Sequence, residues 1–248
     1  MGSSESPIVV ALPARRVASS LASVALTLVA ISLVFGAVKA VSRDAVPEWF
    51  GDLFSLNQEG ALPAFFSGGL LLISSGLFAT TWFVEGRTNR RRVMWLVLAA
   101  VFMFLSFDEL FAVHERLVGP MNDRFDLPDF LRFAWVIVYL PLVAALAVGF
   151  WRVWVGLPHH IRKAFAAAAV VYLTGAVGFE MVSSARYTGN DADIVYGLIY
   201  TVEETLEMGG LIILIYALLS LLGSYPTSIL LGREPDILPT DGDLDSTL

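Results

Sequence analysis

Long apolar stretches alternate along the chain with short segments of charged and turn-forming residues. A helix needs roughly 20 residues to cross about 30 Å of membrane hydrocarbon, and six of the apolar stretches reach that length. The pattern predicts transmembrane helices over residues 17–39, 61–84, 93–117, 131–155, 164–186 and 193–222. Their limits coincide with turn or charge signals at Arg15-Arg16, Pro47, 87–92, Gly119-Pro120, Pro158 and Gly189-Asn190. The predicted fold class is all-α, a polytopic membrane helix bundle.

The composition favours a membrane protein over a soluble one. Hydrophobic residues make up 56% of the 248 residues, charged residues only 16%, and the mean hydropathy is +0.71. A water-soluble core does not require so much apolar sequence. The chain contains no Cys, which excludes disulfides and thiolate metal ligands. Basic residues stand at the ends of apolar runs and not along one face, so nucleic acid is not expected as a partner.

The placement of Lys and Arg predicts how the chain is oriented. Ten of these 16 residues fall on the side that would hold both termini, so an N-in, C-in topology is expected. The predicted divisions are a cytoplasmic N-terminal segment 1–16, a transmembrane bundle 17–222 and an acidic, disordered cytoplasmic tail 223–248. The expected location is the cytoplasmic (inner) membrane of a bacterium, where the bundle would contact membrane lipid.

Three of the predicted spans carry ionisable side chains inside their limits. These are Asp108, Glu109, His114 and Glu115 in the third span, Glu180 in the fifth, and Glu203, Glu204 and Glu207 in the sixth. A charged side chain at the bilayer centre costs about 2.5–3.5 kcal/mol, so seven unpaired carboxylates would cost on the order of 20 kcal/mol. They must be paired, protonated, hydrated or bound to a cation. In the expected orientation all three sets fall in overlapping layers on the outer side.

Helical phase places several of these side chains on common faces, at about 100° per residue. The sixth span carries one polar stripe, which consists of Tyr196, Tyr200, Glu203, Glu207 and Gly210. On the third span, Asp108 and Glu115 are seven residues apart and nearly eclipsed, and His114 is displaced from them by roughly 100°. The three spans therefore predict a shared polar site.

A site rich in carboxylate oxygen, with one His and no Cys, favours Mn, Fe, Mg or Ca over structural zinc or copper. We expect a divalent metal there, with Fe, Mn and Zn as the ions to test. The expected metal ligands are Asp108, His114, Glu115, Glu180, Glu203 and Glu207. The expected supporting or proton-transfer residues are Glu109, Glu204, Tyr196 and Tyr200.

Several uses of such a site stay open at this point. A bound metal could serve a membrane metalloenzyme that acts on a lipid or small molecule, although the Glu-x-x-His pairs of two-metal carboxylate sites are missing. The same acids could belong to a proton- or ion-coupled transporter. They could also pair with basic residues of a partner membrane subunit, or the chain could form a homo-oligomer.

Two stretches resemble a known family. FLSFDELFAVHERL (104–117) and TVEETLEMGGLIILIYALL (201–219) are similar to segments of a largely uncharacterised family of bacterial multi-pass membrane proteins. Members of that family show a similar Asp-Glu…His-Glu segment followed later by Glu-Glu-x-x-Glu-Met. The resemblance implies that the two segments belong together in one fold, and it implies no activity.

Overall fold

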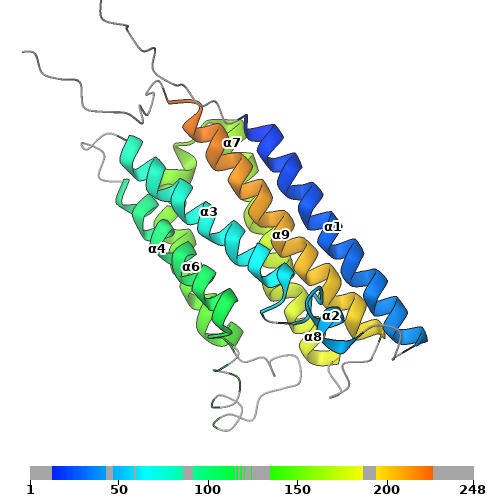
Figure 1. The fold of residues 1–248 in the computed structure, drawn as a ribbon. Helices are drawn as coiled ribbons and strands as arrows, with labels where there is room; N and C mark the ends of the chain where they lie inside the picture. Colours follow the sequence, from blue (N-terminus) through cyan, green and yellow to red (C-terminus); the bar gives the residue numbers. More distant parts are fainter. Residues whose placement is uncertain are drawn as a thin grey trace, which may run out of the picture. The chain divides into compact units, whose positions relative to one another are not determined.

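Figure 1 shows the computed structural model, which describes residues 13–42, 47–58, 60–85, 92–114, 135–186 and 194–225, together with positions 116, 118, 120 and 124. The elements are α1 (Ala14–Val41), α2 (Glu48–Asp52), α3 (Leu62–Val84), α4 (Val93–Phe111), α6 (Trp135–Val155), α7 (His159–Leu173), the π-helix η3 (Thr174–Phe179), α8 (Glu180–Arg186) and α9 (Ile194–Leu222). Six helical spans within these ranges are long and apolar enough to cross a membrane. The predicted all-α membrane bundle with six spans is confirmed.

Most of the predicted span limits agree with the helices to within a few residues. The fifth span is longer than expected, because it begins at His159 and runs through α7, η3 and α8 to Arg186. Residues 1–12 and 226–248 lie outside the described part of the chain, so the predicted N-terminal segment and acidic tail stay predictions. The N-in, C-in orientation also stays a prediction.

The prediction that residues 93–117 form one continuous helix is wrong. α4 ends at Phe111, because Ala112 adopts a left-handed conformation with φ 52° and ψ 44°. The Ala112 backbone N–H donates to the carbonyl oxygen of Asp108 and closes the helix end. The turn that follows brings His114 back toward Asp108, so the displacement of roughly 100° expected from helical phase does not apply.

α9 packs against most of the other elements, namely α1, α3, α7, η3 and α8 (Figure 1). Half of the most apolar part of α9 is buried, compared with 6% for α1 and 11% for α6. α1 and α6 therefore present apolar side chains outward, as helices that contact lipid do. The polar stripe predicted on α9 lies on the most enclosed helix of the described chain.

Two glycines let the fifth span approach α9 at backbone contact. A Cβ atom added at Gly210 would lie 2.6 Å from the backbone nitrogen of Tyr172. A Cβ atom added at Gly175 would lie 2.8 Å from the carbonyl oxygen of Glu203. No side chain fits at such separations, and small residues at helix crossings are typical of membrane bundles. These two contacts determine how the fifth span packs against α9 at Tyr172 and at Glu203.

Buried hydroxyl groups join α3 to α4. Ser75 Oγ donates to the Ala99 carbonyl oxygen at 2.7 Å, and Ser106 Oγ donates to the Gly68 carbonyl oxygen at 2.8 Å. Hydrogen bonds between membrane helices contribute about 0.6 kcal/mol on average and up to about 1.7 kcal/mol. The pair fixes the register of α4 against α3, and so determines the depth at which the last turn of α4 places Asp108.

Candidate functional site

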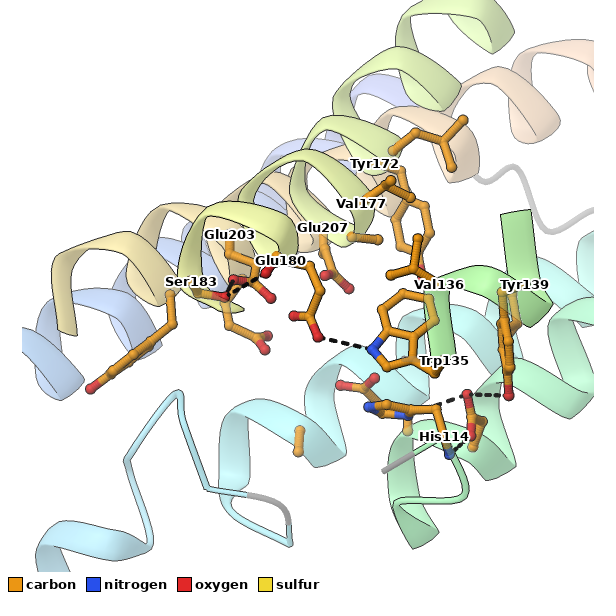
Figure 2. A pocket seen from close by; sticks show the side chains of 18 of the residues that line it. His114, Trp135, Val136, Tyr139, Tyr172, Val177, Glu180, Ser183, Glu203 and Glu207 are labelled. Carbon is orange, nitrogen blue, oxygen red and sulfur yellow. Dashed lines mark hydrogen bonds and ion pairs between the residues drawn. The ribbon is translucent and has the colours of Figure 1, made fainter. Parts of the chain in front are cut away.

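A cavity of about 450 Å³ lies among α4, α6, α9 and the fifth span. Its volume is within the range of about 300–1,000 Å³ that is usual for small-molecule sites. The polar and aromatic side chains that line it are Asn57, Gln58, Asp108, Glu109, His114, Trp135, Tyr139, Tyr172, Glu180, Ser183, Tyr196, Tyr200, Glu203, Glu204 and Glu207. Figure 2 shows many of these side chains pointing into one space.

Asp108 is held by a network on the α4 side of the cavity. The whole residue is only 5% exposed. The His114 backbone N–H donates to Asp108 Oδ1 at 2.7 Å, and the Tyr139 hydroxyl donates to Asp108 Oδ2 at 3.1 Å. His114 Nδ1 lies 3.4 Å from the same Oδ2 and forms an ion pair with it when the imidazole is protonated. Both carboxylate oxygens of Asp108 are therefore occupied by protein donors.

α6 connects this network to the opposite wall. Trp135 Nε1 donates to Glu180 Oε1 at 2.9 Å (Figure 2). Trp135 and Tyr139 are four residues apart and share a helix face, where their rings pack edge to face with centroids 5.3 Å apart. One turn of α6 thus binds Glu180 through an indole and Asp108 through a phenol. Neither residue was predicted from the sequence to belong to the site.

Glu180 and Glu203 meet on the far wall, where α8 faces α9. Their side chains are in hydrogen-bonding contact, and Ser183 Oγ lies 3.1 Å from Glu203 Oε2 and can donate to it. Glu203 is 8% exposed, so little solvent reaches it. Two carboxyl groups in contact require a shared proton or a cation, because two bare negative charges repel each other strongly in a site of low dielectric constant.

Glu207 stands one turn further along α9, in contact with the fifth span at Gly175. Its carboxyl group points into the same space as those of Glu180 and Glu203 (Figure 2). None of the described residues donates a hydrogen bond to it, and the acids Glu204, Glu109 and Glu180 interact with it electrostatically. The oxygens of the Glu207 carboxyl group can therefore accept hydrogen bonds from a molecule in the cavity.

Nine of the ten residues predicted for the site line this one cavity. They are Asp108, Glu109, His114, Glu180, Tyr196, Tyr200, Glu203, Glu204 and Glu207. The tenth, Glu115, lies outside the described residues. Within the described ranges, no three His, Asp or Glu side chains lie close enough together to hold one metal ion. The predicted divalent metal, and the roles assigned to these residues, stay predictions.

The π-helix η3 ends at Phe179, immediately before Glu180. Short π-helical segments are frequent at functional sites. Sequence reasoning treated residues 164–186 as a regular α-helix and missed this feature. Gly175 and Gly178 inside the segment are the only hint of it in the sequence.

The lining is strongly one-sided in charge. Six carboxyl side chains face the cavity, and no Lys or Arg of the described chain lines it. Such a lining attracts cations and repels anions.

Comparison with curated proteins and with solved structures found no match. One family model matches residues 14–222, which include all six spans and every described residue of the cavity. Its description is "Domain of unknown function". The chain belongs to this family, DUF8692.

Proposed function

We propose that this integral membrane protein binds a cation in the cavity inside its helix bundle. The observation that carries the proposal is the lining of six carboxyl side chains without a described Lys or Arg. Ionisable groups inside membrane spans face such cavities and mark binding sites or ion pathways. A bound cation would bring positive charge among these acids, and no described Lys or Arg lines the cavity to do so.

The energetic need for a cation is largest where α8 meets α9. Two unit charges about 4 Å apart interact by about 4 kcal/mol at an effective dielectric constant of 20. Glu180, Glu203 and Glu207 crowd their carboxyl groups into one part of the cavity. A bound cation converts several repulsions into attractions, so these three acids form the centre of the proposed site.

Luminescence of terbium(III) tests this proposal. This hard trivalent ion prefers carboxylate oxygens, and it emits when a nearby excited tryptophan transfers energy to it. In purified protein in lipid nanodiscs we expect saturable emission, for which Trp135 supplies the energy. The Glu203→Gln/Glu207→Gln double variant is expected to weaken the apparent affinity by about tenfold or more, which corresponds to at least about 1.4 kcal/mol.

Two control variants separate the cavity from other acids. Glu48→Gln removes a carboxylate beside Trp49 in α2, outside the cavity, and is expected to leave the emission unchanged. Trp135→Phe keeps a ring in place and is expected to reduce the emission. Terbium binding that is the same in the double variant as in the parent protein would contradict the proposal.

We also propose the bacterial inner membrane as the location, with both termini in the cytoplasm. Support comes from the excess of Lys and Arg on one side of the spans. The chain lacks Cys, so single substitutions can be labelled without a background. In intact cells a membrane-impermeant maleimide is expected to label Glu48→Cys but not His160→Cys, and to label both after permeabilisation. The reverse pattern in intact cells would overturn this orientation.

A further inference from the structure

We infer that the cation bound in the cavity is a protonated organic amine. This inference rests on the cation binding proposed above and names the chemical class of the ligand. It is carried by three features of the cavity: its size, its aromatic walls and the carboxyl group of Glu207, to which no described residue donates a hydrogen bond.

The cavity is too large for one bare ion, and its acids do not converge as the ligands of one ion do. Divalent cations sit about 2.0–2.6 Å from their oxygen ligands, so the ligands of one ion lie within a few ångströms of each other. Here the volume is about 450 Å³, and no three described acidic or His side chains converge on one point. A molecule with a body of several carbon atoms fills such a space, whereas a single ion leaves most of it empty.

Aromatic rings form much of the wall between the carboxyl groups. Trp135 packs edge to face with His114 at 5.5 Å and with Tyr139 at 5.3 Å between centroids. Tyr196 and Tyr200 form a second edge-to-face pair at 5.6 Å on α9. Aromatic faces attract organic cations and also pack against hydrocarbon. Acids alone would suit any cation, but acids with aromatic walls favour one that carries an organic body.

Glu207 indicates which kind of organic cation fits. Asp108 receives hydrogen bonds from protein donors, Glu180 receives one from Trp135, and Ser183 can donate to Glu203. No described residue donates to Glu207. An ammonium group has three N–H donors, so it can bond to Glu207 and also to a free oxygen of a neighbouring acid, Glu203 or Glu180. A quaternary ammonium has no N–H and would leave Glu207 without a hydrogen bond.

The charge of the lining also excludes a class of amines. A ligand that carries a phosphate or carboxylate would place that anion among the six acids that line the cavity, where like charges repel. The ligand is therefore an amine without an anionic group, which separates it from phospholipid headgroups and from amino acids. A diamine matches the lining better than a monoamine, because it neutralises more of the acids.

Displacement of terbium by matched compounds tests this inference. The compounds are 1,4-diaminobutane, the uncharged analogue 1,4-butanediol, the divalent ion Mg²⁺ and phosphoethanolamine as an amine with an anionic group. In nanodiscs we expect 1,4-diaminobutane to displace terbium at a concentration about tenfold or more below that of Mg²⁺. Butanediol and phosphoethanolamine are expected to have no effect at the concentration at which the diamine is saturating.

Substitutions in the cavity test where the amine binds. Glu207→Gln keeps the shape of the side chain and is expected to weaken the competition by 1,4-diaminobutane about tenfold, while Glu48→Gln leaves it unchanged. Glu203→Gln gives a second test if the first variant does not elute as a single species on gel filtration. If Mg²⁺ or Mn²⁺ displaces terbium at a lower concentration than the diamine, the amine inference is overturned and cation binding stands. If terbium does not bind the cavity at all, both proposals fail.

Discussion

Gly210→Ala is expected to force α7 away from α9 and to destabilise the folded bundle. The added Cβ atom would lie 2.6 Å from the backbone nitrogen of Tyr172, 2.7 Å from its Cβ and 2.8 Å from its Cα. Backbone atoms cannot rotate away as a flexible side chain can, so whole helices must shift. Overpacking of this kind costs about 1–3 kcal/mol, and we expect a value at or above the upper end. The measurement is unfolding in mixed micelles by titration with a denaturing detergent.

The neighbouring glycine provides a matched control. A Cβ atom at Gly209 would meet only Val171 Cγ1, at an ordinary contact distance of 3.9 Å. Alanine is a better helix former than glycine by about 1 kcal/mol, so Gly209→Ala is expected to be neutral or slightly stabilising. The two variants share the same chemical change and differ in what the new methyl group touches. Equal stabilities for Gly209→Ala and Gly210→Ala would show that α7 and α9 do not pack as described.

Asp108→Asn is expected to give the second large effect, because it breaks the network that joins α4 to α6. The amide keeps one acceptor oxygen in place of two, while the His114 N–H and the Tyr139 hydroxyl bond to different oxygens of the carboxylate. Hydrogen bonds to a charged group contribute about 1.5–3 kcal/mol each, and we expect the variant to lose stability in that range. The loss should be accompanied by weaker terbium binding, because α6 also positions Trp135 at Glu180.

A double-mutant cycle with Tyr139→Phe distinguishes this network from a general effect of the missing charge. The phenol bonds directly to Asp108 Oδ2, so the two changes are expected to be non-additive by about 0.5–3 kcal/mol. Tyr216→Phe is a matched control, because Tyr216 lies on α9 and does not line the cavity. Full additivity of Asp108→Asn and Tyr139→Phe would mean that the contact does not stabilise the fold.

The spans and most of the cavity residues could be predicted from the sequence for one physical reason. Acids are costly inside a membrane, so Glu180, Glu203 and Glu207 had to face a polar interior, and helical depth already placed them in one layer. Trp135 and Tyr139 could not be identified in that way. An aromatic residue in an apolar helix has the same pattern whether it faces lipid or donates to a buried carboxylate.

The end of α4 escaped prediction because no local signal marks it. The residues after Asp108 continue with Leu110, Phe111 and Val113, which are as apolar as the helix body. The residue in the left-handed conformation is Ala112, whereas glycine or asparagine usually occupies that position at a helix end. What favours the turn is a side-chain contact six residues back, namely the Asp108 carboxylate that accepts the His114 N–H. Helical periodicity cannot predict a hydrogen bond that forms only after the chain turns back on itself.

The π-helix η3 has a consequence for how Glu180 reaches the cavity. A π-turn contains one residue more than an α-turn, so it rotates everything that follows by roughly 100° about the helix axis. Glu180 and Ser183 are the first cavity residues after it. In an uninterrupted α-helix of the same sequence they would be turned away from Glu203 by that angle. The meeting of the two glutamates thus depends on a single extra residue in a helical turn, in a segment that contributes no charge of its own.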